Sequence, residues 1–226
     1  MNGIDRLLTL RAENDRAGVR MLEAAPCFLA LAQRHIEGTA PRAVAGFNLF
    51  QTPRPIAERM ARIVAGEVGP GARILEPSAG LGRLFEPFAE LEELRNNWVM
   101  VEEARECYNA IKSAMRRADV RNRDFLSTTP AELGGKFDAV IMNPPFKQGR
   151  DIKHVAHAFD MLKAGGVLVS LCYNGKRQNA KLKPIAATWE ELPHGSFNSE
   201  GTGASVALLT MRKLCVHNHT NQDSTT

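Results

Sequence analysis

Residues 72–94 constrain the fold of this chain more than any other segment, because they have the pattern of a strand, a glycine loop and a helix. The segment Ala72-Arg-Ile-Leu75 has the length of a short strand, and Glu76-Pro-Ser-Ala-Gly-Leu-Gly82 follows it directly. A strand that passes through a tight glycine turn into a helix is the first crossover of a doubly wound sheet. Gly80 and Gly82 let a ligand approach the backbone closely, because neither carries a side chain.

The same loop differs from two common nucleotide-binding signatures. The third glycine of the dinucleotide-binding fingerprint is missing, and no Gly-Lys-Ser/Thr follows as it would in a phosphate-binding P-loop. The two glycines by themselves therefore do not identify the ligand.

A second strand is expected at Trp98–Val101, with Glu102 at its carboxyl end. Glu102 lies 102 − 80 = 22 residues after Gly80, which is close to the ~20-residue offset at which an acidic residue reaches a ribose diol in this topology. Glu103 is adjacent and would serve if the strand register shifted by one residue; we favour Glu102.

A buried strand followed by an unusual corner is expected at Phe137–Phe146. The apolar run ends at Asn143-Pro-Pro-Phe146, and two prolines cannot continue a sheet ladder. The Asn143 amide oxygen and the Pro144 carbonyl can accept hydrogen bonds from an exocyclic amine, and Phe146 can stack on the ring that bears it. A proline-rich turn without a chemical role is the alternative.

Helices and strands are also expected around these motifs. Thr52 is a suitable N-cap, with Pro53 at the first position of a helix that includes Ile56–Val68, and its free amides would suit a carboxylate. A helix over 151–163 is expected to end at Gly165-Gly166, followed by a strand at 167–171. A glycine-rich turn leads into a final strand over 201–210.

The motifs, in this order over residues 47–211, resemble class I S-adenosyl-L-methionine (SAM)-dependent methyltransferases that modify amino nitrogens, and most of all DNA adenine-N6 methyltransferases. The Glu76–Gly82 loop is similar to their cofactor motif, Asn-Pro-Pro-Phe to their catalytic motif, and Phe50-Gln-Thr-Pro53 to the segment that grips the cofactor carboxylate. The resemblance implies an α/β fold: a doubly wound, mostly parallel, seven-stranded sheet with a C-terminal antiparallel hairpin.

The resemblance also implies the roles of individual residues. In the family, an acidic residue at the end of the third strand bonds the adenine of the cofactor and an apolar neighbour flanks the ring, which corresponds to Asp124 and Phe125 here. The implied catalytic residues are Asn143, Pro144, Pro145 and Phe146. The residues implied to bind SAM are Gln51, Thr52, Pro53, Glu76, Pro77, Ala79, Gly80, Gly82, Glu102, Asp124, Phe125 and Asn143.

Basic residues after the last parallel strand suggest a polyanionic substrate. The net charge of the chain is +4, and the residues expected to contact nucleic acid are Lys147, Lys176, Arg177, Lys181 and Lys183. A solvated charged face is the alternative. The expected reaction is methylation of adenine-N6 in DNA, with relaxed selectivity because no separate recognition domain is seen. RNA adenine, cytosine-N4, a protein glutamine, and a non-catalytic nucleic-acid-binding module remain alternatives.

The expected organisation is an N-terminal helical extension at 1–45, a methyltransferase domain at 46–214 and a polar, disordered tail at 215–226. No metal site is expected, because His154 and His157 have no third ligand at a suitable spacing. No apolar run is long enough to cross a membrane, and the N-terminus lacks a secretory signal pattern. The four cysteines are scattered, which is typical of a reducing compartment such as the cytoplasm.

Overall fold

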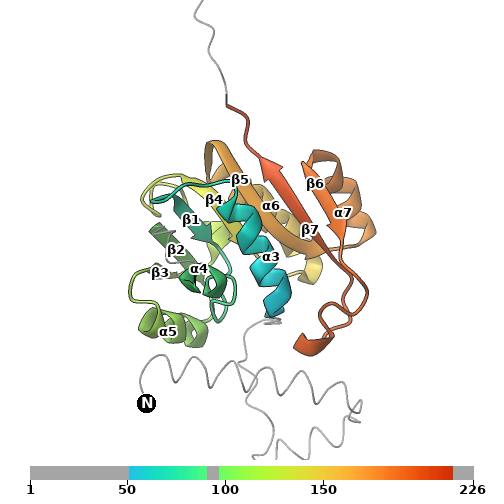
Figure 1. Ribbon diagram of the computed structural model, residues 1–226, viewed down its shortest axis with the longest axis horizontal. Helices are drawn as coiled ribbons and strands as arrows, with labels where there is room; N and C mark the ends of the chain where they lie inside the picture. Colours follow the sequence, from blue (N-terminus) through green and yellow to red (C-terminus); the bar gives the residue numbers. More distant parts are fainter. Residues whose placement is uncertain (1–50, 91–96, 216–226) are drawn as a thin grey trace, which may run out of the picture.

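The computed structural model describes residues 51–90 and 97–215. The helical extension predicted at 1–45 and nearly all of the predicted tail lie outside these described residues. Seven strands form one sheet in the order β3-β2-β1-β4-β5-β7-β6 (Figure 1). The strands are β1 (Arg73–Glu76), β2 (Asn97–Glu102), β3 (Asp119–Asn122), β4 (Phe137–Met142), β5 (Leu162–Tyr173), β6 (Thr188–Glu191) and β7 (Val206–Arg212).

The pairing of the strands confirms the predicted fold class. Strands β1 to β5 are parallel to one another, whereas β7 runs antiparallel to both β5 and β6. From β1 the chain proceeds outward to β2 and β3 and then returns to place β4 on the other side of β1. The carboxyl ends of β1 and β4 therefore meet at the topological switch point, where ligands bind in sheets of this kind.

Helices cover both faces of the sheet. They are α3 (Arg54–Ala65), α4 (Glu86–Glu90), α5 (Arg105–Ala114), α6 (Arg150–Asp160) and α7 (Lys176–Lys181), with short 3-10 turns η1 (Phe125–Ser127), η2 (Lys147–Gly149), η3 (Lys183–Ile185) and η4 (Asn198–Glu200). In Figure 1, α3 crosses the front of the sheet and α6 lies behind it.

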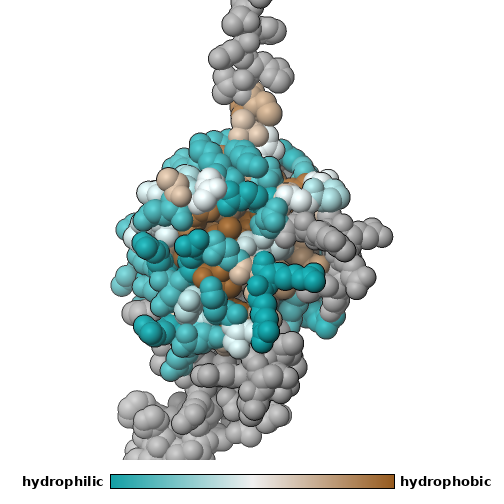
Figure 2. Space-filling model, turned by 90° about the vertical axis from the view of Figure 1, so that its left-hand side faces the viewer, coloured by the Kyte–Doolittle hydropathy of each residue, from teal (hydrophilic) through white to brown (hydrophobic). Residues whose placement is uncertain are grey.

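The alternation of side chains along the strands explains this layering. Ile141 of β4 is buried on the α3 side with Met60, while its neighbour Val140 is buried on the α6 side with Val155. Both faces of the sheet are apolar, as a parallel sheet covered by helices requires. The surface on the side of β3 and α5 is mostly hydrophilic, with apolar groups showing in a small central area (Figure 2).

The start of α3 differs from the prediction. Pro53 is the N-cap and the helix begins at Arg54, so the prediction of Thr52 as N-cap with Pro53 at the first helical position was wrong by one residue. The reason is that the Pro53 carbonyl accepts the N–H groups of both Ile56 and Ala57, at 3.0 Å each, which closes the first turn on Pro53. The helix ends at Ala65, three residues before the predicted end.

Two other predicted helix boundaries also differ from the structure. Helix α4 begins at Glu86 rather than at residue 83, because successive tight turns follow the glycine loop. The predicted end of a helix at Gly165-Gly166 was wrong: α6 ends at Asp160, and both glycines lie inside β5. Leu162 already pairs with Phe137 of β4, and a register shift accommodates the glycines before Val167 pairs with Ala139.

Candidate functional site

A cavity of about 290 Å³ lies at the carboxyl edge of the sheet, at the switch point between β1 and β4. Most of the predicted site residues line it together, although they are spread over nearly a hundred positions of sequence. The predicted residues in its wall are Gln51, Thr52, Glu76, Pro77, Ala79, Gly80, Glu102, Asp124, Phe125, Asn143, Pro144, Pro145, Phe146 and Lys147. Pro53 and Gly82 are outside the wall, and each is adjacent in sequence to a lining residue.

Glu102 joins the end of β2 to the glycine loop. Its side chain is only 8% exposed, and its two oxygens accept backbone hydrogen bonds from Gly80 (2.7 Å) and Ala104 (2.6 Å). Burial raises the pKa of this carboxyl, while the two backbone N–H donors act in the opposite direction. Each carboxylate oxygen has a second lone pair, so Glu102 can hold the loop and still accept a hydrogen bond from a ligand.

Glycine is needed in the loop that Glu102 holds. Gly80 has a φ of +54° and Gly82 a φ of +73°, in the left-handed region that residues with a Cβ rarely adopt. Glycine at these two positions therefore serves two purposes: it lets a ligand approach the backbone closely, and it adopts the left-handed conformation of the loop.

Asp124 stands at the next strand end and is held by two different groups. Its Oδ1 accepts the N–H of Leu126 at 3.1 Å, which caps η1. The Arg150 guanidinium lies 3.7 Å from the same oxygen and 3.5 Å from Glu103 Oε2. Arg150 therefore spans the mouth of the cavity from α6 to the ends of β2 and β3.

Phe125 forms the floor of this part of the cavity. It is 2% exposed, and its ring centroid lies 5.6 Å from that of His154 and 4.8 Å from that of His157. His154 lines the cavity wall beside it, with Nδ1 3.3 Å from Ser78 Oγ of the glycine loop. Burial, the largest cause, lowers the pKa of His154 to about 4, so its ring is neutral near neutral pH.

The Asn143–Phe146 corner follows β4 as predicted. The strand ends at Met142, Asn143 is half-buried, and all four corner residues line the cavity. Phe146 packs against the apolar cluster on the α3 side of the sheet. Since β1 and β4 are paired neighbours, the corner and the glycine loop lie side by side at the same edge.

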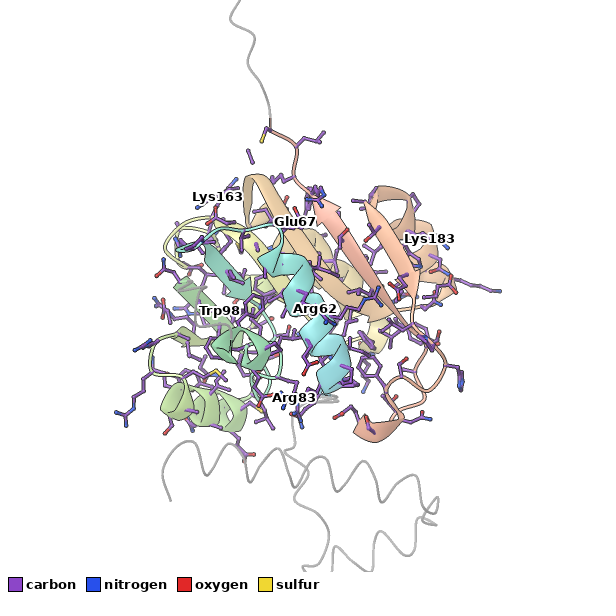
Figure 3. The ribbon with its side chains drawn as sticks, in the orientation of Figure 1. Arg62, Glu67, Arg83, Trp98, Lys163 and Lys183 are labelled. Atoms are coloured by element: carbon purple, nitrogen blue, oxygen red, sulfur yellow. The ribbon has the colours of Figure 1, made fainter. Side chains whose placement is uncertain are left out.

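The basic residues are only partly brought to the cavity. Lys147 lines it, but Lys176, Arg177 and Lys181 are exposed on α7, and Lys183 is exposed on η3. Lys183 Nζ lies 3.5 Å from Glu191 Oε1. Figure 3 shows Arg83 at the carboxyl edge, whereas Lys183 lies beside the edge strand β6, away from it.

Some cavity residues were not found from the sequence. They are Ser78, Leu81, Arg83, Leu84, Glu103, Ala104, Arg123, Arg150 and His154. Glu103 was considered only as a substitute for Glu102, and His154 only as a metal ligand. The spacing of Arg150 and His154, four residues apart on the helix that follows the corner after the η2 turn, is the signal that could have indicated them.

Two further observations on the described part of the chain concern metal binding and membranes. Residues 51–90 and 97–215 contain no group of three His, Cys, Asp or Glu side chains arranged to hold a metal ion. Within the same residues, no helix has the length and apolar character needed to cross a membrane.

A doubly wound sheet with an antiparallel final strand, and a switch-point cavity built from a glycine loop and two acidic strand ends, define the class of SAM-dependent methyltransferases. The residues fit the cofactor: Glu102 offers acceptors for a ribose diol, and Asp124 and Phe125 offer an acceptor and a flat apolar surface for a purine. The family model described as Methyltransferase small domain matches residues 69–194, and the chain belongs to this family. Its cofactor is SAM.

Several solved structures have the same fold as this chain. A type I restriction-modification methyltransferase subunit from Streptococcus thermophilus is 20% identical, with a TM-score of 0.63, and the match covers 74% of this chain and 45% of that chain. A putative class I SAM-dependent methyltransferase from Listeria monocytogenes is 17% identical (TM-score 0.58; 83% and 66% covered). A putative RNA methyltransferase from Pyrococcus horikoshii is 19% identical (TM-score 0.54; 74% and 88% covered).

These likenesses show a shared fold. This chain spans about half the length of the Streptococcus thermophilus subunit. A comparison with curated proteins found no match to the sequence.

Proposed function

We propose that this methyltransferase transfers the methyl group of SAM to the exocyclic N6 amine of adenine in DNA, with little sequence selectivity. One observation supports the proposal above all others: the Asn143–Phe146 corner lines the same cavity as Glu102 and Asp124. A pair of acceptors suited to an amine therefore stands next to the loop suited to the cofactor.

The corner would act by orienting the amine. The lone pair of an adenine amine is delocalised into the ring, which makes the nitrogen a poor nucleophile. Hydrogen bonds from its two N–H groups to the Asn143 side-chain oxygen and the Pro144 carbonyl favour a pyramidal nitrogen whose lone pair points at the methyl donor. When bound, SAM supplies an electrophilic methyl group on a positively charged sulfur.

The same oxygen atoms would stabilise the transition state. Positive charge develops on the amine nitrogen as its bond to carbon forms and the carbon–sulfur bond breaks, with the electron pair of that bond remaining on sulfur. Dipoles of the Asn143 amide and the Pro144 carbonyl point their negative ends at this charge. The methylated nitrogen then loses one proton to water, and no strong base is needed.

The position of the corner also bears on the substrate. A base inside a duplex cannot reach a cavity at the edge of a sheet, so a DNA substrate must present a flipped or unpaired adenine. Phe146 would stack on its ring. Lys147 at the cavity and Lys176 at the start of α7 supply positive charge for the flanking phosphates, which gives affinity without sequence information.

RNA adenine, cytosine-N4 and a protein glutamine carry the same kind of planar amine. The names of the fold neighbours include both a restriction-modification subunit and a putative RNA methyltransferase. At 20% and 19% sequence identity, the likeness to these two proteins shows the fold alone. The substrate is therefore tested by the experiment below.

The test is incubation of the protein with labelled SAM and, separately, DNA, RNA and glutamine-containing peptide, followed by mass spectrometry of the digested products. We expect N6-methyladenine from DNA, formed on the order of a hundredfold or more slowly by the Asn143→Ala variant. Label found only in RNA, in cytosine-N4 or in glutamine would contradict the proposed substrate. Equal transfer by Asn143→Ala would contradict the proposed role of the corner.

A further inference from the structure

Asp151 is a buried carboxylate that lies outside the cavity. It is the second residue of α6 and is fully buried, yet burial of a charged group is unfavourable unless hydrogen bonds compensate. Its oxygens accept the N–H groups of Ile152 (2.9 Å) and Tyr173 (3.0 Å), and Gln178 Nε2 reaches both oxygens at 3.0 and 2.9 Å. Burial nevertheless raises the pKa of Asp151.

These hydrogen bonds join three elements at the catalytic edge. Ile152 belongs to α6, Tyr173 is the last residue of β5, and Gln178, itself 4% exposed, belongs to α7. Asp151 is separated from the Asn143–Phe146 corner only by the η2 turn and Arg150. The group that fixes α7 to the start of α6 therefore also fixes the far end of the turn that follows the corner.

The η2 turn has a conformation that needs support. Gln148 has a φ of +58° and Gly149 a φ of +73°, and Gln148 is the one non-glycine residue with a positive φ in residues 51–90 and 97–215. Left-handed conformations of non-glycine residues cost on the order of 1 kcal/mol or more and persist where the surroundings hold them.

Arg177 of α7 is the neighbour that holds the turn. Its Nη1 donates to the Gln148 carbonyl at 3.4 Å. A Cβ at Gly149 would lie 3.0 Å from Arg177 Nη1 and 3.5 Å from Arg177 Cδ, so the arginine side chain passes directly over the glycine. Within the turn, the Gly149 N–H donates to the Phe146 carbonyl at 3.2 Å, which links this packing to the corner itself.

We propose that Asp151 and Arg177 brace the η2 turn between α6 and α7 and thereby position the Asn143–Phe146 corner for methyl transfer. The inference rests on the proposed catalytic function of that corner. In this proposal, Arg177 has a role other than phosphate binding. Asp151 is a positioning residue that touches neither cofactor nor substrate.

Asp151→Asn is the first variant to test. An Asn side chain has one acceptor oxygen, so whichever way it is turned its NH2 group faces the NH2 of Gln178 and the N–H of either Tyr173 or Ile152. We expect kcat to fall on the order of 10- to 100-fold, because displacement of a reacting group by about 1 Å has that effect. The Kd for SAM should stay within about twofold, because Asp151 lies outside the cavity wall.

The double variant Asp151→Asn with Gln178→Glu separates positioning from a general loss of stability. The new glutamate accepts from the Asn NH2 group and the Asn oxygen accepts from Tyr173, so the bonds to Tyr173 and to residue 178 are restored, and only the Ile152 N–H loses its acceptor. We expect it to recover most of the lost kcat. Asp160→Asn, on the exposed C-terminal end of the same helix, is the matched control and should behave as the wild type.

Arg177→Lys tests the other half of the brace without removing charge. Phosphate affinity depends on that charge, so the salt dependence of DNA binding should be unchanged, whereas kcat should fall several-fold because a lysine lacks the planar fork that reaches Gln148. If Asp151→Asn does not fold, the kcat values of Arg177→Lys and Gln178→Met test the proposal in its place.

Hydrogen exchange provides a readout that does not depend on the substrate. In Asp151→Asn and Arg177→Lys, the amides of residues 146–149 should exchange faster, while those of residues 79–82 in the glycine loop should not change. Unchanged exchange at 146–149, wild-type kcat in the folded variants, or failure of the double variant to recover would overturn the inference. Faster exchange in a protein that methylates no nucleic acid would overturn the proposed function alone.

Discussion

Replacement of Glu102 by glutamine tests how the cofactor is held. In the structure both carboxylate oxygens accept a backbone N–H, from Gly80 at 2.7 Å and from Ala104 at 2.6 Å. A glutamine of the same shape has one acceptor and one donor group. Whichever way its amide is turned, the NH2 group faces one of the two backbone N–H groups, so the substitution is not conservative at this position.

The free-energy cost expected for Glu102→Gln has two parts. One buried N–H left without a partner costs about 1–3 kcal/mol, and this cost falls on the unfolding free energy of the cofactor-free protein. A ribose hydroxyl that loses its charged acceptor costs a further ~1–3 kcal/mol of binding, which is roughly 5- to 150-fold in Kd. The two costs can be measured separately because only the second needs the cofactor.

Calorimetric titration of wild type and Glu102→Gln with SAM gives the binding part, and denaturation without cofactor gives the folding part. Glu106→Gln removes an exposed carboxylate one helical turn further along the chain and should change neither. A folded Glu102→Gln protein with wild-type affinity would refute the assignment of the ribose to Glu102. Weakened binding in Glu103→Gln instead would transfer that role to Glu103.

Three further predictions follow from the site. Asn143→Ala should lower kcat by on the order of a hundredfold or more while the Kd for SAM stays within several-fold, as measured by single-turnover assay and calorimetry; near-normal turnover would contradict the mechanism. Because the folded pKa of His154 is about 4 against an ordinary 6.5, its contribution to stability is present above 6.5 and is lost as the pH falls toward 4. The unfolding free energy of wild type relative to His154→Gln should therefore fall by about 2 kcal/mol between about pH 7 and about pH 5, and a constant difference would contradict burial of a neutral ring. Replacing Lys147 and Lys176 by alanine should flatten the log–log salt dependence of DNA binding by up to about 0.9 per lost phosphate contact; an unchanged slope would show that these side chains touch no phosphate.

The sequence predicted the sheet and the positions of the loops well, because the signals are local. The apolar run at 137–142 and the two prolines after it fix where β4 ends, and Gly80 and Gly82 fix where the chain turns after β1. The offset between Gly80 and Glu102 predicted that Glu102 reaches the ribose of a ligand, and the structure adds a hydrogen bond of 2.7 Å from the Gly80 N–H to Glu102 that was not predicted. The partner of Glu102 in that bond is a backbone N–H, which no side-chain pattern could indicate.

Of the predictions that failed, one depended on long-range strand pairing and one on hydrogen bonds within the first turn of a helix. Gly165-Gly166 has the pattern of a helix end, but pairing of Leu162 with Phe137 draws the chain into the sheet before the glycines are reached. The N-cap of α3 moved from Thr52 to Pro53 because the first turn closes on the Pro53 carbonyl, and the Thr52 side chain is buried in the cavity wall. Composition and spacing do not contain these tertiary contacts.

Helix α6 connects the parts of this site that the sequence presented as separate motifs. Its first turn carries Arg150, which spans the cavity mouth to Asp124, and Asp151, which is bonded to the ends of β5 and α7. One turn further, His154 lies against Phe125 and the glycine loop. Because the helix follows the Asn143–Phe146 corner after only a three-residue turn, α6 links the corner to the wall of the cofactor cavity. Substitutions on α6 and on the corner should therefore be energetically coupled rather than additive.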